Sequence, residues 1–146
     1  MDHYQEIVSD YLRADRAIFL NTRYRLPGHR VESADKPYWD IDIVALNMRK
    51  RRAYLCEVTY TLDAPALLRR FAAWREHWKE MVEGLIAMSG LSPEWQVKAW
   101  IFTPAHIRES IEQQVRFWHP DARFTDLELV APWKYDRERI DVDEER

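Results

Sequence analysis

The chain has 146 residues, of which 47% are hydrophobic, including seven tryptophans and seven tyrosines. This length fits one domain, and the apolar content predicts a folded globule and excludes a disordered chain. The net charge of −3 means that the domain as a whole does not attract phosphate, so any contact with nucleic acid must use a local basic patch.

Several features bear on where the protein works. The first residues are acidic and no basic-then-apolar segment follows them, so no secretory signal is expected. No apolar run is long enough to span a bilayer. The single cysteine, Cys56, has no partner, which favours a reducing compartment and excludes a cysteine-based zinc site. We expect a cytoplasmic protein with no membrane partner.

The first half of the chain predicts a helix followed by three strands. Apolar residues recur at helical spacing over residues 3–14. A strand is predicted at 17–25, and a polar loop rich in turn formers extends to residue 37. Two further strands, at 40–47 and 53–61, flank a basic turn and predict an antiparallel hairpin.

The second half alternates helices and strands. Asp63 is a plausible cap for a long helix that ends near Met88. A strand is predicted at 95–102, and Thr103 is expected to cap a helix that ends near Trp118.

The last elements complete a mixed α/β pattern. An edge strand is predicted at 123–130. The domain is expected to span residues 1–133, followed by a frayed, charged C-terminal tail at 134–146. The order of elements indicates a hairpin whose last strand feeds a crossover helix into a parallel neighbour.

Carboxylates lie within both strands of the hairpin, where an ionised side chain is costly unless it is paired, hydrogen-bonded or bound to a metal. Strand alternation places Asp40, Asp42 and Val44 on one face, and Glu57 and Thr59 on one face of the next strand. In an in-register hairpin Asp42 and Glu57 can approach each other. Two carboxylates, with carbonyl oxygens and waters, suit Mg²⁺ or Mn²⁺ and the hydrolysis of a phosphodiester.

The sequence Asp-Ile-Val-Ala-Leu from Asp42, followed after the basic turn by Leu-Cys-Glu-Val-Thr ending at Thr59, resembles the core of the PD-(D/E)XK nuclease superfamily. This resemblance implies the restriction-endonuclease-like fold: a three-layer α/β/α core with a mixed central sheet and element order αβββαβ, here followed by a helix and an edge strand. It implies that Asp42, Glu57 and Thr59 are catalytic, that Asp42 and Glu57 hold Mg²⁺ or Mn²⁺, and that DNA is the partner. Thr59 stands where the family has a lysine.

Three further residues are candidates for this site. Threonine carries no charge, so Arg75, at the flank of the apolar stripe of the long helix, and Lys98, on the following strand, are possible substitutes for the lysine. Each has a structural alternative, because Arg75 can extend along the edge of a buried face and Lys98 can lie on a solvated one. Asp40 is either an additional metal ligand or a strand-end residue in water.

The basic run between the hairpin strands is the candidate nucleic-acid contact; it consists of Arg49, Lys50, Arg51 and Arg52. The alternative is a solvated turn that protects the hairpin from aggregation.

Other catalytic chemistries find little support in the sequence. The five histidines are dispersed, which disfavours a zinc hydrolase, and three glycines cannot form a glycine-rich phosphate loop.

The leading hypothesis is a metal-dependent nuclease-like protein that hydrolyses or binds DNA through Asp42 and Glu57. The alternative is a catalytically degenerate nuclease fold that serves as a protein- or nucleic-acid-binding module. A third hypothesis is a homodimeric scaffold joined through surface tryptophans. In a purely structural interpretation, hydrogen bonds satisfy Asp42, and Glu57 pairs with an arginine.

Overall fold

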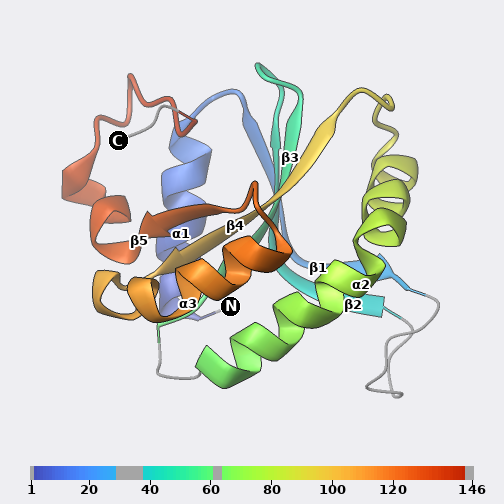
Figure 1. The fold of residues 1–146 in the computed structure, drawn as a ribbon. Coiled ribbons are helices and arrows are strands. Elements are labelled where there is room, and N and C mark those ends of the chain that lie inside the picture. Colours follow the sequence, from blue (N-terminus) through green and yellow to red (C-terminus); the bar gives the residue numbers. More distant parts are fainter. Residues whose placement is uncertain (1, 29–37, 61–63, 144–146) are drawn as a thin grey trace.

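The computed structural model describes residues 2–28, 38–60 and 64–143, which form one five-stranded mixed sheet and three α-helices (Figure 1). The expected mixed α/β class is confirmed. The elements, in chain order, are α1 (His3–Ala14), β1 (Ile18–Pro27), β2 (Tyr38–Asn47), β3 (Arg52–Val58), α2 (Ala64–Ser89), β4 (Gln96–Thr103), α3 (Ala105–Trp118), β5 (Arg123–Asp126) and the 3₁₀ helices η1 (Leu127–Val130) and η2 (Pro132–Lys134). Asp63, the expected helix cap, lies outside the described residues.

The sheet has the strand order β1-β2-β3-β4-β5. β2 pairs with β1 and β3 in antiparallel fashion, and β4 pairs with β3 and β5 in parallel. The predicted hairpin and the predicted crossover through α2 into a parallel neighbour are therefore confirmed. Because β3, β4 and β5 run in the same direction, their carboxyl ends lie along the same edge of the sheet.

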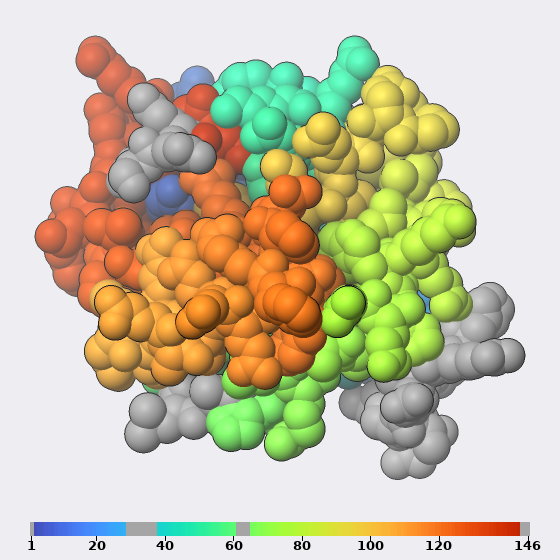
Figure 2. All heavy atoms as spheres, viewed as in Figure 1, coloured from blue at the N-terminus to red at the C-terminus, as the bar shows by residue number. Residues whose placement is uncertain are grey.

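Helices cover both faces of the sheet, giving three layers. One core cluster joins a sheet face to α2 and α3, and a second joins the opposite face to α1, η1 and residues near the C-terminus. Figure 1 shows α1 on one side of the sheet and the other two helices on the opposite side. In Figure 2 the side chains of α2 and α3 cover the face turned toward the viewer. Trp74 and Trp100 are the largest fully buried side chains, one in each cluster.

The C-terminal segment is anchored more firmly than the sequence predicts. Ile140 and Val142 are buried in the α1 layer. The Asp143 carboxylate accepts a hydrogen bond from the Tyr54 hydroxyl and forms an ion pair with Arg123 at 2.9 Å. The expectation of a frayed tail is therefore wrong for residues 140–143, and residues 144–146 lie outside the described part of the chain.

The start of α3 also differs from the prediction. Pro104 occupies the N-cap position, and its side chain makes no capping hydrogen bond. The expected cap, Thr103, has a buried hydroxyl with no hydrogen-bond partner among the described residues. The Glu128 carboxylate caps the helix instead, because it accepts a hydrogen bond from the Ala105 N–H at 3.0 Å.

Of the helices in the described ranges, none combines the length and apolar character needed to cross a membrane.

Candidate active site

β2 changes its side-chain alternation at Asp42. Ile41 packs in the same core cluster as Val44, and Ile43 packs in the cluster on the opposite face. Strict alternation would put Ile41 and Val44 on opposite faces, so the common face predicted for residues 40, 42 and 44 is not maintained. The last pair of the ladder between β2 and β3 is Ile43 with Cys56, so the ladder stops just short of Asp42 and Glu57. The two strands therefore part where the acidic residues lie.

β1 is distorted at the same level. Thr22 pairs with Ile43 and Tyr24 with Ile41, which leaves Arg23 opposite Asp42 without a ladder pair. The φ angle of Arg23 is 51°, in the left-handed region that residues with a side chain rarely adopt. Such backbone strain concentrates at functional sites and is consistent with one here.

Asp42 is oriented by the backbone of the neighbouring strand. Its Oδ2 accepts a hydrogen bond from the Val58 N–H at 3.0 Å. The ladder between β2 and β3 has ended at Cys56, two residues before Val58. The bond to Asp42 therefore satisfies the Val58 N–H and fixes the carboxylate. Asp42 is thereby held against the end of β3, next to Glu57.

Glu57 is a buried carboxylate with few partners. The residue is 1% exposed, its Oε1 forms an ion pair with Arg70, and the Asp42 side chain lies within hydrogen-bonding reach. Burial and the adjacent Asp42 carboxylate raise the pKa of Glu57 well above its usual value, and Arg70 opposes them only in part. An ionised Glu57 therefore requires a further cation, and without one the carboxyl group favours its protonated form.

Arg70 supplies the positive charge at this site. Its Nη1 lies 3.1 Å from Oε1 of Glu57, and its side chain remains 47% exposed. The charge of Glu57 is the main cause that raises the pKa of Arg70, and Asp42 and Asp40 add to it. The guanidinium is therefore placed between the buried Glu57 carboxyl group and solvent.

The site opens into a cavity of about 250 Å³. Its walls come from Asp42 in the middle of β2, from the end of β3 and the residues after it, and from the N-terminal parts of α1 and α2; they include Asp2, Asp42, Thr59, Tyr60, Leu67 and Arg70. Glu57 is 1% exposed and is not among the residues that line this cavity. A ligand entering here would meet Asp42 and Arg70 first.

The structure places two of the three predicted catalytic residues together and the third beside them. Asp42 and Glu57 are neighbours, as the hairpin register predicts. Thr59 lines the cavity, and its N–H donates to the Phe102 carbonyl at 3.0 Å. Asp40 is exposed, and within residues 2–28, 38–60 and 64–143 no group of three or more acidic, histidine or cysteine side chains is placed to hold a metal ion. Asp40 therefore does not complete a three-ligand set.

Neither predicted substitute for the lysine reaches the carboxylates. The Arg75 guanidinium lies over the Phe117 ring, 5.6 Å from its centroid, at the contact between α2 and α3. Lys98 is paired in register with Tyr54, so it lies on the sheet face that packs against α1. Glu57 alternates with its neighbours onto the opposite face, so Lys98 cannot act on it.

The basic run at residues 49–52 does not form one free patch. Arg49 pairs with the buried Asp15 at 3.0 Å, and Arg51 pairs with Glu94 at 3.1 Å. The turn lies at the start of β3, roughly 17 Å along the strand from Glu57 at the usual rise per residue. Two of the four cations proposed for nucleic acid are therefore engaged within the protein, at the end of the hairpin remote from the carboxylates.

Arg70 is the site residue that sequence reasoning missed. It follows Leu67 by three positions and precedes Trp74 by four, so a helical wheel places it on the apolar stripe of α2 rather than at its edge. A charged residue on a buried stripe requires a partner, and this signal could have identified Arg70.

A scan of protein-family models finds no match to the chain, and a search of curated proteins finds none either.

Proposed function

We propose that this protein is a divalent-metal-dependent phosphodiesterase of nuclease type, with Asp42 and Glu57 as metal ligands and Arg70 as the phosphate-facing cation. The observation that carries the proposal is Glu57: a carboxyl group that is 1% exposed and lies beside a second carboxylate, with Arg70 as its ion-pair partner. Burying an acid beside a second one against a single arginine is costly, whereas a divalent cation would balance their charge.

The donor set fits Mg²⁺ or Mn²⁺. Both are hard cations that prefer oxygen, and Mg²⁺ commonly binds through one or two carboxylates, with waters and substrate phosphates as its other ligands. Asp42 and Glu57 supply the two carboxylates, and the adjoining cavity of about 250 Å³ leaves space for water and a phosphate group. A bound ion would lower the pKa of a water molecule and neutralise charge on the phosphate.

Arg70 takes over part of what the motif lysine does. It is 47% exposed, so its remaining N–H groups can reach a phosphate in the cavity while it contacts Glu57. A guanidinium stays protonated and cannot accept a proton from water, so its contribution is positioning and charge stabilisation. Asp42, fixed by the Val58 N–H, keeps its carboxylate directed at the same point.

The arrangement of the hairpin supports placing this chain with the restriction-endonuclease-like folds. The acidic residues lie where β2 and β3 part, and α2 follows β3 and leads into a parallel neighbour. We propose DNA as the substrate because this is what the motif resemblance implies.

A second candidate is a catalytically degenerate nuclease fold that binds protein or nucleic acid. The observation in its favour is the 3.1 Å approach of Arg70 to Glu57, which places a protein cation where a metal would be held. In this alternative Arg70 permanently replaces the metal, and the protein neither binds Mn²⁺ nor cleaves DNA.

The experiment is a cleavage assay on labelled single- and double-stranded DNA with Mg²⁺, Mn²⁺ or chelator. Asp42→Ala and Glu57→Gln are compared with Asp40→Asn, an exposed acid close by in sequence. The proposal expects metal-dependent cleavage that both site variants abolish and Asp40→Asn retains. Wild-type protein that cleaves neither DNA form in either metal overturns the proposed activity, and cleavage that survives Glu57→Gln overturns the assigned site.

A further inference from the structure

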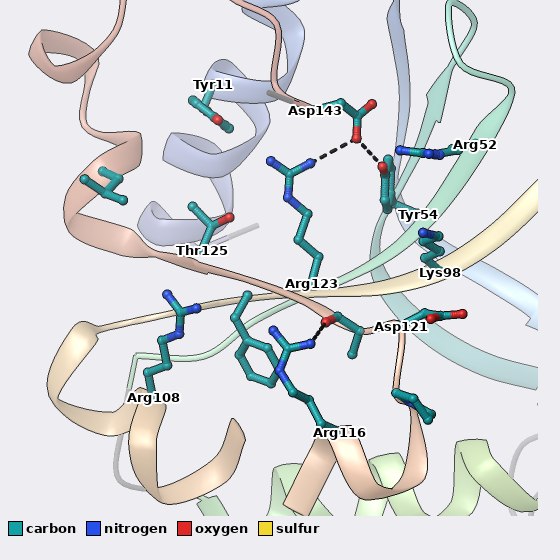
Figure 3. A pocket seen from close by; sticks show the side chains of 14 residues that line it. Tyr11, Arg52, Tyr54, Lys98, Arg108, Arg116, Asp121, Arg123, Thr125 and Asp143 are labelled. Carbon is teal, nitrogen blue, oxygen red and sulfur yellow. Dashed lines mark hydrogen bonds and ion pairs between the residues drawn. The ribbon is translucent and has the colours of Figure 1, made fainter. Parts of the chain in front are cut away.

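A second cavity, of about 440 Å³, lies beside β5 and has no lining residue in common with the cavity at Asp42 (Figure 3). Its volume lies within the range of small-molecule sites, about 300–1,000 Å³. Cationic side chains dominate its lining, namely Arg52, Lys98, Arg108, Arg116 and Arg123. The carboxylates among its lining residues are Asp121 and Asp143. A hollow with this excess of positive charge is unusual in a chain of net charge −3.

Two of these arginines are held by acids on the α3 side. Arg108 pairs with Glu112 at 2.9 Å and with Asp126 at 3.2 Å. Arg116 pairs with the other oxygen of Glu112 at 2.9 Å and donates a hydrogen bond to the Ala122 carbonyl. Their charges are largely balanced, so they form a rigid wall rather than free ligands.

Arg123 is also fixed, on the other side of β5. Its Nη1 pairs with Asp143 at 2.9 Å, its Nη2 donates to the Val142 carbonyl, and its guanidinium stacks over the Trp100 ring. Two of its five N–H groups suffice for these bonds, which leaves others for a ligand. Burial and the hydrogen bond to Asp143 raise the pKa of Tyr54 to about 12, so this phenol remains a donor beside Arg123.

Arg52 and Lys98 are the cations that carry the argument. They lie on neighbouring strands on one sheet face, because Lys98 is paired in register with Tyr54, two residues after Arg52. Figure 3 shows both side chains beside Tyr54 at the wall of the cavity. Arg52 donates to the Tyr54 hydroxyl, and among the ion pairs of the described residues neither Arg52 nor Lys98 is joined to a carboxylate. Like charges on neighbouring strands of one sheet face disfavour each other, and an anion bound between them would relieve this repulsion.

We propose that this cavity binds a small phosphorylated molecule, with Lys98 and Arg52 as the phosphate ligands and Arg123 as a preorganised third donor. Arginine presents a fork that matches two phosphate oxygens, and lysine adds a point charge, so the set suits phosphate better than a single carboxylate. The proposal is independent of the phosphodiesterase proposed above.

The charge distribution favours a small ligand over nucleic acid. A nucleic-acid strand requires an extended basic stripe. Here Asp121 and Asp143 lie in the lining, and beyond it Arg49 and Arg51 are paired with Asp15 and Glu94. Next to this hollow, two of the cations of the hairpin turn are therefore already engaged within the protein.

The test is isothermal titration calorimetry with inorganic pyrophosphate as the probe. We expect one bound pyrophosphate per chain, with affinity at least ten-fold weaker in Lys98→Met and in Arg52→Met. Lys79→Met removes an exposed lysine of α2 and should leave the affinity unchanged, as should Asp42→Asn at the other cavity. Thermal melting of each variant establishes that it is folded.

Two results would overturn the proposal. The first is wild-type protein that does not bind millimolar pyrophosphate, or that binds it equally well in Lys98→Met and Arg52→Met. The second comes from a parallel titration with a single-stranded oligonucleotide that lacks terminal phosphates. If Lys98→Met weakens binding of the oligonucleotide and not of pyrophosphate, the cavity recognises a nucleic-acid backbone and not a small phosphorylated molecule.

Discussion

Arg70 Nη1 lies 3.1 Å from Oε1 of Glu57, joining a half-exposed guanidinium on α2 to a carboxylate buried at the end of β3. This single cation does not balance the burial of Glu57 and the adjacent negative charge of Asp42, so the pKa of Glu57 stays well above its usual value. The site is therefore short of positive charge, and a divalent ion would supply it.

Glu57→Gln should stabilise the metal-free protein at neutral pH. Because the pKa of Glu57 is higher in the folded than in the unfolded protein, folding favours the protonated form, and wild-type stability falls as the pH rises above about 4.5, the usual pKa. Glutamine mimics the protonated acid and removes this loss. Urea unfolding in chelator should show a difference that grows between pH 5 and pH 8, to on the order of 1 kcal/mol. A difference that is constant with pH would contradict the assigned titration.

Metal binding should release a proton. A ligand carboxylate must be ionised, and the raised pKa of Glu57 makes this step part of binding. The apparent Mn²⁺ affinity of the wild-type protein should therefore rise with pH. Calorimetry in two buffers of different ionisation enthalpy measures the protons released. Equal heats in the two buffers below the pKa of Glu57 would show that this carboxyl group does not take part.

Arg70→Met should have opposite effects on metal affinity and on cleavage. Loss of a cation 3.1 Å from Glu57 should strengthen Mn²⁺ binding several-fold, because the two positive charges no longer compete. Cleavage at saturating metal should fall by about 10²-fold, since the phosphate loses its stabilising donor. Arg75→Met, at the contact with Phe117, should change neither.

Thr59→Lys provides a rescue of this variant. Thr59 lines the same cavity as Arg70, so a lysine there returns a cation near Asp42. Combined with Arg70→Met, it should recover part of the lost cleavage. A double variant as inactive as Arg70→Met would mean that the position of the charge matters more than its presence.

Val142→Ala tests the anchoring of the C-terminal segment. The side chain is fully buried, so its truncation should destabilise the protein by about 2 kcal/mol in urea unfolding. Glu138→Ala alters an exposed residue of the same segment and should cost less than about 0.5 kcal/mol. Equal stability of both variants would show that residues 140–143 do not contribute to the core.

The sequence predicts those features that local patterns determine. The helix at residues 3–14 follows from one apolar stripe, and the approach of Asp42 to Glu57 follows from hairpin register. The interaction of Arg70 with Glu57 depends on how α2 crosses the sheet, which no local pattern encodes. The buried Ile140 and Val142 are hidden in the sequence by the charged residues around them.

The basic turn shows the same dependence on tertiary structure. Composition reveals that Arg49 and Arg51 are cations, but their partners, Asp15 and Glu94, lie far away in the sequence. Tertiary structure therefore decides whether a charge is available to a ligand. The pairing of β3 with β4 likewise brings together Arg52 and Lys98, two cations that the sequence separates.

The most direct test of the account is a Mn²⁺ titration at pH 8, in which electron paramagnetic resonance measures the free ion. We predict one bound ion per wild-type chain, the same stoichiometry for Asp40→Asn, and loss of binding in Asp42→Ala and Glu57→Gln. Wild-type protein that binds no Mn²⁺, or a Glu57→Gln variant that binds it with full affinity, would contradict the assignment of Asp42 and Glu57 as a metal site.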